Sequence, residues 1–114
     1  MVKYCIQTRN YCSDRVVFTE DQRSSKGAKH PELREEGFIE RVRQAIEKPD
    51  FVYQDLANYS RHVYYRYEYT ANGRDRYVKV VIETSQEPYF VITAYRPDFI
   101  KEEGKTKLIY KNDH

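Results

Sequence analysis

The chain is poor in the residue types that mark several common protein classes. It has no tryptophan, and only four glycines, four prolines and two cysteines in 114 residues. Cys5 and Cys12 are separated by six intervening residues and only three histidines are present, so the spacing fits neither a zinc site nor a disulfide framework. We therefore expect two free thiols, no metal and no cofactor.

Long hydrophobic runs are also absent. No apolar run approaches the ~20 residues that a membrane span requires, and the N-terminus from Met1 to Cys5 lacks the hydrophobic region of a signal peptide. Glycine-rich phosphate loops and nucleophile elbows do not occur either. The sequence therefore predicts a soluble cytoplasmic protein with no membrane partner.

Aliphatic residues are scarce, but tyrosine is abundant. Leu, Ile, Val and Phe make up 25 of the 114 residues, about 22%, which is close to the composition of disordered chains. Twelve tyrosines compensate, because each buries a large ring while its hydroxyl stays hydrated or hydrogen-bonded. The length is that of one domain, so we expect a single domain over residues 1–114. The net charge of +2 neither requires nor excludes a nucleic-acid partner.

The first half of the chain has a helical pattern. Val16 to Phe18 form a short apolar run. This run is either a strand or the lead-in to a helix, and Asp14 or Thr19 could cap that helix. Residues 23–29 are polar and form a loop or a poorly formed helix, and Pro31 suits the first position of a helix. Pro49 ends a helix whose apolar residues recur at spacings of three and four, namely Phe38, Ile39, Val42, Ala45 and Ile46.

After Pro49 the pattern changes to the period of β-strands. Four strands are predicted at residues 51–53, 62–69, 77–84 and 89–96, with a further short strand at 108–110. Asn72-Gly73 suits a tight hairpin turn, and residues 85–88 form the next turn. We therefore expect an α+β fold, in which N-terminal helical segments precede an antiparallel four-stranded β-meander and the helix packs on one sheet face.

Alternation along the strands predicts which side chains the helix leaves open. The predicted covered residues are Val78, Val80, Ile82, Phe90, Ile92 and Ala94, together with Val63, Tyr65 and Tyr67 of the long strand. The predicted open residues are Tyr64, Arg66, Lys79, Thr93 and Tyr95, with Val81 and Val91 beside them. This face lacks the acidic cluster of magnesium-dependent phosphoryl chemistry.

The open face instead suits a phosphodiester. Arg66 can bind two phosphate oxygens at once and Lys79 supplies a point charge. RNA carries its own nucleophile, the 2′-hydroxyl, so cleavage needs only proton transfer and charge stabilisation, without metal or cofactor. His30, next to Lys29 at the entrance of the helix, is the histidine best placed for the proton transfer.

Several short motifs, in their order and spacing, resemble the phage-type members of the barnase, EndoU, colicin tRNase and RelE (BECR) superfamily of ribonucleases. The motifs are Lys29-His30-Pro31-Glu32-Leu33, Ile46-Glu47-Lys48-Pro49-Asp50-Phe51-Val52, Val63-Tyr64-Tyr65-Arg66, Tyr77-Val78-Lys79-Val80-Val81 and Val91-Ile92-Thr93-Ala94-Tyr95. The resemblance covers roughly residues 16–111. It implies helices followed by a four-stranded meander, and metal-independent cleavage of RNA on the open side of the sheet.

The resemblance also implies roles for single residues. His30 is the acid or base, and Thr93 binds the phosphate or stabilises the transition state. Lys79 and Arg66 are carried over as groups that bind the phosphate. In the leading hypothesis, Tyr95 helps Thr93 to orient it. The remaining candidate substrate contacts are Lys29, Tyr64 and Arg96.

Each residue also has a purely structural interpretation. His30 would cap a helix, Thr93 would serve β-propensity, Lys79 would keep an exposed sheet soluble, and most tyrosines would pack across strands. The leading hypothesis is a toxin- or phage-associated ribonuclease, with RNA as substrate and an antitoxin or immunity protein as a further partner. The alternatives are a catalytically silent RNA-binding domain and a protein-interaction domain.

Overall fold

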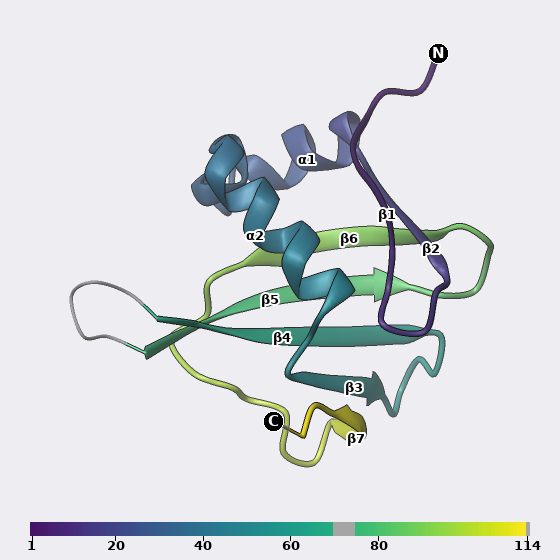
Figure 1. The fold of residues 1–114 in the computed structure, drawn as a ribbon, viewed down its shortest axis with the longest axis vertical. Coiled ribbons are helices and arrows are strands. Elements are labelled where there is room, and N and C mark those ends of the chain that lie inside the picture. Colours follow the sequence, from purple (N-terminus) through teal and green to yellow (C-terminus); the bar gives the residue numbers. More distant parts are fainter. Residues whose placement is uncertain (70–74, 114) are drawn as a thin grey trace.

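Strands dominate the fold. The computed structural model describes residues 1–69 and 75–113, and within them seven strands form one sheet of order β1-β2-β6-β5-β4-β3-β7 (Figure 1). β2 and β6 are parallel, and every other neighbouring pair is antiparallel. The elements are β1 (Tyr4–Arg9), β2 (Arg15–Thr19), α1 (Glu20–Gly27), the 3₁₀ helix η1 (Pro31–Arg34), α2 (Glu36–Glu47), β3 (Phe51–Asp55), β4 (Arg61–Tyr69), β5 (Asp75–Glu83), β6 (Tyr89–Tyr95) and β7 (Thr106–Lys111).

The expectation of N-terminal helices followed by a four-stranded antiparallel meander is wrong. A β1–β2 hairpin precedes the helices, and parallel pairing of β2 with β6 makes the sheet mixed. β1 escapes sequence analysis because it is an edge strand in which Ile6 is the only buried residue. The hairpin turn is built by Asn10, whose Oδ1 accepts hydrogen bonds from the backbone N–H groups of Cys12 and Asp14, each at 2.9 Å.

The polar segment after β2 is a helix. Residues 23–29, expected to form a loop or a poorly formed helix, fall largely within α1, which begins after the N-cap Thr19. The Thr19 hydroxyl accepts a hydrogen bond from Gln22 N at 3.1 Å, and acidic side chains occupy the first turn. Only Gly27 of this helix is buried, so polar contacts contribute strongly to its placement.

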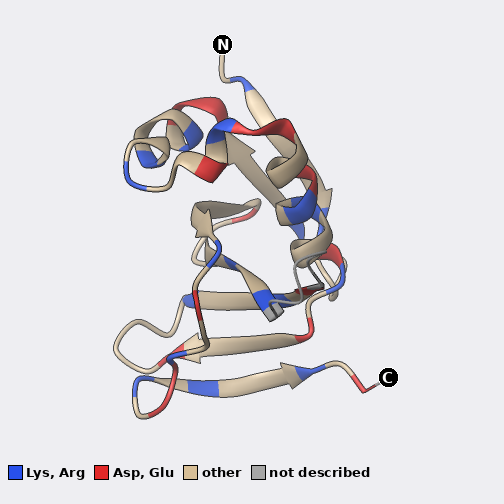
Figure 2. Ribbon diagram, turned by 90° about the vertical axis from the view of Figure 1, so that its left-hand side faces the viewer, with Lys and Arg blue, Asp and Glu red and all other residues tan. Residues whose placement is uncertain are grey.

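α2 supplies the main cover of the sheet. Its buried residues are those predicted from the sequence: Phe38, Ile39, Val42, Ala45 and Ile46. The helix contacts β1, β4 and β5, and Figure 1 shows it crossing the sheet on one side. The buried core joins this stripe to side chains of β2, β4, β5 and β6. None of the described helices is both long and apolar enough to span a membrane. Along the helices, basic and acidic residues are intermixed (Figure 2).

Strand register defines two faces of the sheet. Val78, Val80 and Ile82 of β5 are buried in the core beneath α2, as predicted. Lys79 therefore points to the other side, which we call the open face, and it is paired with Tyr65 of β4 and Tyr95 of β6. Thr93, paired with Val81, lies on the same face.

The predicted faces of β4 are reversed. Tyr64 pairs with Val80 and Arg66 with Val78, so both lie on the helix side, whereas Tyr65 lies on the open face. Alternation could not separate them because Tyr64 and Tyr65 are both fully buried. In β6, an irregularity in pairing places Val91 rather than Phe90 or Ile92 opposite Ile82, so Val91 and Ala94 join the core.

Part of the open face is covered by the chain itself. β6 and β7 are separated in the sheet by three strands, so residues 96–105 must travel from one side of it to the other. Glu102 of this connection is buried against β4, where its carboxylate accepts a hydrogen bond from the Tyr65 hydroxyl. The predicted Asn72-Gly73 turn lies outside the described residues.

A carboxylate joins β4 to the end of β6. Glu68 accepts hydrogen bonds from Arg96 Nε at 2.8 Å and Nη2 at 3.2 Å, and Arg41 of α2 lies 3.5 Å from it. The Arg96 guanidinium also lies over the Phe38 ring, 4.5 Å from its centroid. The hydrogen bonds from Arg96, with the surrounding positive charge, lower the pKa of Glu68 below its ordinary value of 4.5.

This pair predicts a pH-dependent contribution to stability. A carboxyl with a lowered pKa stabilises the fold above its ordinary pKa, and that contribution is lost as the pH falls toward the pKa in the folded protein. Glu68→Gln should lower the free energy of unfolding by about 1–3 kcal/mol at pH 6. In urea titrations at pH 3, the difference in the free energy of unfolding between Glu68→Gln and wild type should be smaller than at pH 6. An equal difference at pH 3 and pH 6 would contradict this prediction. Glu103→Gln, an exposed change, is the control.

Candidate functional site

His30 lies on the segment between α1 and η1. Its backbone N–H donates to Lys26 O at 3.0 Å, and its carbonyl accepts from Leu33 N at 3.0 Å. The imidazole stacks on the Tyr95 ring with centroids 4.2 Å apart and planes only 4° from parallel. The histidine is therefore in direct contact with a residue of the open face.

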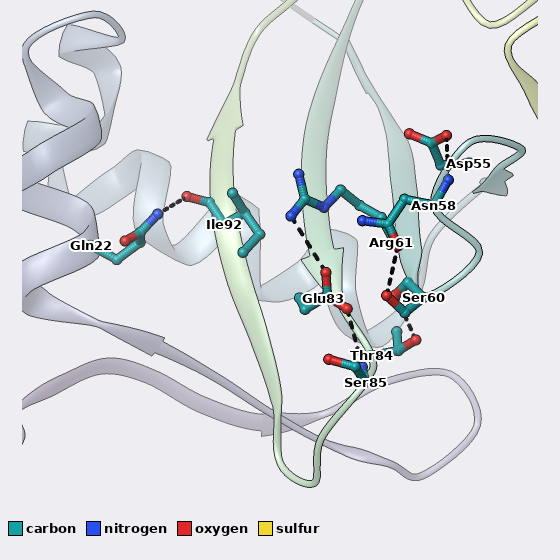
Figure 3. Close-up of polar contacts among 9 residues, drawn as sticks. All are labelled: Gln22, Asp55, Asn58, Ser60, Arg61, Glu83, Thr84, Ser85 and Ile92. Atoms are coloured by element: carbon teal, nitrogen blue, oxygen red, sulfur yellow. Dashed lines mark hydrogen bonds and ion pairs between the residues drawn. The ribbon is translucent and has the colours of Figure 1, made fainter.

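Two hydrogen bonds fasten the segment that carries His30 to β6. Gln22 Nε2 of α1 donates to Ile92 O at 2.6 Å, a contact shown in Figure 3. On the other side of His30, Glu32 Oε2 accepts from Arg96 N at 3.2 Å. Because these contacts flank Tyr95 in β6, they hold the histidine over that strand.

Lys79 extends the same cluster across the sheet. Its Nζ lies 5.5 Å from the centroid of the Tyr95 ring and 5.7 Å from that of Tyr65. It also lies 3.4 Å from Glu102 Oε1, and the exposed fractions of the two side chains are 18% and 8%. A cation between two aromatic faces is stabilised by their ring quadrupoles, so this ammonium is held in place by three neighbours.

Thr93 shares the open face, and its side chain makes no hydrogen bond to any other described residue. Its Oγ1 is buried and has no partner among the described residues. It is two residues before Tyr95 in β6, so both side chains project from the same side of the strand. A buried hydroxyl without a partner is uncommon and is a natural contact for a bound ligand.

Arg61 lies at the other end of this face and was not predicted from the sequence. Its Nη2 lies 3.4 Å from Glu83 Oε1 of β5, and its buried Nε has no partner among the described residues. Figure 3 shows its side chain lying across the neighbouring strand toward the strand that carries Ile92. Nearby, Ser60 O accepts from both Thr84 N at 2.8 Å and Thr84 Oγ1 at 2.6 Å, which ties the ends of β4 and β5 together.

Three predicted site residues have structural contacts elsewhere. Arg66 donates to Lys48 O at 2.6 Å at the end of α2, and Tyr64 accepts from Asn10 Nδ2 at 3.0 Å inside the core. Arg96 pairs with Glu68 and covers Phe38. Arg66 and Tyr64 therefore lie on the helix side of the sheet, and the Arg96 guanidinium is engaged by Glu68 although its backbone adjoins Tyr95. Lys29 is exposed and adjoins His30 in the chain.

Two partners of Lys79 were also missed. Tyr65 was assigned to the covered face, and Glu102 lies in a connection with no periodic pattern. The pairing of Tyr65 with Lys79 would have shown that this tyrosine lies on the open face. The register between two strands is set by the whole sheet, however, and cannot be read from one strand alone. No feature of the sequence brings Glu102 to the sheet.

Burial sets the protonation of the two key aromatic groups. Desolvation lowers the pKa of His30 below 6.5; Glu32 opposes this shift, whereas Lys29 and Lys26 add to it. His30 is therefore neutral at pH 7 and can accept a proton. Desolvation and the Glu102 carboxylate raise the pKa of Tyr65 far above its usual value, so its hydroxyl stays protonated.

The described residues contain no cluster of three or more His, Cys, Asp and Glu side chains able to hold a metal ion. What the open face does present is an imidazole, an ammonium, a buried hydroxyl and stacked aromatic rings. These groups are suited to binding an anion and moving a proton beside it.

Comparison with curated proteins and with solved structures gives no match. Residues 7–111, which include every strand from β2 to β7, match the protein family described as phage-Barnase-EndoU-ColicinE5/D-RelE like nuclease 2. The match therefore covers the sheet and both helices that position the open face. The chain belongs to this nuclease family, PBECR2.

Proposed function

We propose that the chain is a metal-independent endoribonuclease in which a ribose 2′-hydroxyl attacks the adjacent phosphate. Membership of a nuclease family supports nuclease activity in general. The observation that favours this site is that His30 and Lys79 both contact the ring of one residue, Tyr95. A proton acceptor and a cation thus lie beside the same ring, and in the proposed complex one phosphate contacts both.

Each group has a defined role in the proposed reaction. The neutral His30 imidazole takes the proton of the 2′-hydroxyl, and the resulting oxygen forms a bond to phosphorus. Lys79 offsets the charge that develops on the phosphate oxygens, and the Thr93 hydroxyl donates to one of them. Tyr95 orients the imidazole through stacking.

The bond between phosphorus and the 5′-oxygen then breaks. The leaving oxygen takes a proton from the Lys79 ammonium, and the products are a 2′,3′-cyclic phosphate and a 5′-hydroxyl. Lys29, exposed beside His30, is a proposed contact for the next phosphate of the RNA. A toxin role, with an antitoxin or immunity protein as partner, stays a prediction of the sequence.

Replacement of the proposed base gives the first test. His30→Ala should lower kcat/KM for a single-stranded RNA by ~10²- to 10⁴-fold with little change in melting temperature. His62→Ala is the matched control, because His62 lies on the helix side of β4 and should retain wild-type activity. Wild-type cleavage by His30→Ala would refute the assignment of this residue.

The chemical route is tested with modified substrate. RNA with a single 2′-deoxynucleotide at the mapped cleavage site should not be cut at that bond, because the nucleophile is missing. Cleavage of unmodified RNA should continue in EDTA and should yield 2′,3′-cyclic phosphate ends, detectable by mass spectrometry. Binding of RNA without any cleavage would favour the silent RNA-binding alternative instead.

The acidic limb of the pH–rate profile reports the proposed base. Since burial lowers the pKa of His30, the active neutral form should persist below pH 6.5, and kcat/KM should fall about tenfold per unit only below that lowered pKa. The residual activity of His30→Ala should lack this limb. A limb that begins above pH 6.5 would contradict the role of His30.

A further inference from the structure

A second cation lies on the open face, at the end that the proposed reaction does not use. Arg61 of β4 pairs with Glu83 of β5, four residues along β5 from Lys79, so Arg61 and Lys79 project from the same side of the sheet. We propose that Arg61 binds a second phosphate of the RNA, next along the strand to the phosphate at Lys79. The inference rests on the proposed ribonuclease function and adds a phosphate-binding residue to it.

Two buried polar atoms on this face have no hydrogen-bond partner among the described residues. They are Arg61 Nε and Thr93 Oγ1. Figure 3 shows the Arg61 side chain lying across β5 and directed toward the strand that carries Ile92, the residue before Thr93. Buried donors without a partner are costly, so an anion that receives hydrogen bonds from both groups satisfies donors that the fold leaves unpaired.

The protein holds the Arg61 guanidinium by one long contact. Among the described residues its side chain pairs only with Glu83, at 3.4 Å from Nη2 to Oε1, although a guanidinium carries five N–H groups. The side chain is 39% exposed, so an approaching phosphate meets the outer nitrogens first, and rotation of the guanidinium then brings Nε into contact. Such a fork binds two phosphate oxygens at once.

Glu83 does not depend on Arg61 to remain charged. Its Oε2 accepts a hydrogen bond from Ser85 N at 3.2 Å. Hydrogen bonds from Ser60 and then Ser85 lower the pKa of Glu83 below its ordinary value of 4.5, and the charge of Arg61 contributes less. Arg61 can therefore turn from Glu83 to a phosphate without leaving the carboxylate unpaired.

The surface between the two cations is partly open. Val81 and Thr93 pair across β5 and β6 between the positions of Arg61 and Lys79, and both are half-buried. Four residues of a strand span ~13 Å, and the lean of Arg61 toward β6 shortens the distance between the charges. RNA carries a negative charge at every nucleotide, so one strand that passes over Val81 and Thr93 meets both cations.

The experiment removes single phosphate charges from the substrate. After the cleavage site is mapped, kcat and KM are measured on RNAs that carry one uncharged methylphosphonate linkage at successive positions. At one position beside the cleaved bond, this linkage should raise the wild-type KM by about tenfold to a hundredfold, with kcat nearly unchanged. Arg61→Ala should raise KM on unmodified RNA by a similar factor and should show no additional increase with that modified RNA.

Salt dependence gives an independent measure of the lost contact. For a single strand, the logarithm of the binding constant falls with the logarithm of salt concentration by about 0.7 per neutralised phosphate. The slope for Arg61→Ala should therefore be smaller than that of wild type by about 0.7. It is measured by fluorescence anisotropy on RNA with a 2′-deoxynucleotide at the cleaved bond. Arg61→Lys keeps the charge and should keep the wild-type slope.

Two further variants separate phosphate binding from structural damage. Arg43→Ala is the matched control, because Arg43 is 38% exposed, pairs with two glutamates and lies on α2, on the other side of the sheet; its kcat and KM should equal those of wild type. Glu83→Gln removes the competing carboxylate, so its KM should be at or below the wild-type value. A raised KM for Glu83→Gln would show that the ion pair serves the fold and would refute the phosphate contact. Melting temperatures of all variants check that they fold.

The two hypotheses fail in different ways. If Arg61→Ala has the wild-type KM, or if every methylphosphonate raises its KM as much as that of wild type, the phosphate contact is refuted while the nuclease function stands. If the wild type binds RNA without cleaving it, the proposed function fails, and the anisotropy measurements decide the role of Arg61 by themselves. Equal affinity and equal salt slopes of wild type and Arg61→Ala then refute that role. If the wild type neither binds nor cleaves RNA, both fail.

Discussion

The candidate site depends on how the segment from α1 to η1 is fastened to β6. α1 is polar and buries only Gly27, so burial of apolar side chains does little to fix its place. Gln22 and Glu32 instead hydrogen-bond to the backbone of β6 on either side of Tyr95. Backbone groups of a central strand are rigid anchors, so His30, which lies between these two ties in the chain, is held against the Tyr95 ring.

Charge on the open face is balanced within the protein. Lys79 is largely buried, and its neighbour Glu102 is still more buried and also accepts the Tyr65 hydroxyl bond. A buried ammonium needs such a partner because desolvation of an isolated charge is costly. Under the proposed function, a phosphate that approaches Lys79 would compete with a carboxylate already in place, which makes residues 96–105 part of the electrostatic environment of the candidate site.

Sequence patterns were informative where one side of an element is buried and the other is not. The stripe of α2 and the alternation of β5 meet that condition, and the buried residues of both were predicted. β4 does not, since α2 covers Tyr64 while Glu102 and neighbouring rings cover Tyr65. Its faces were consequently reversed, and Tyr64 and Arg66 lie on the helix side rather than on the open face. β1 was missed because an edge strand with one buried side chain has too little apolar signal.

The sequence by itself determined the nuclease family and the α2 stripe, because short motifs and local periodicity are properties of neighbouring residues. It also predicted His30, Lys79, Thr93 and Tyr95 as site residues. Only the tertiary structure decided that β2 pairs with β6, that Tyr65 rather than Tyr64 faces Lys79, and that Glu102 closes the cluster. These features depend on strand register and on a connection that travels from β6 to β7, and both are fixed by contacts between residues far apart in the chain.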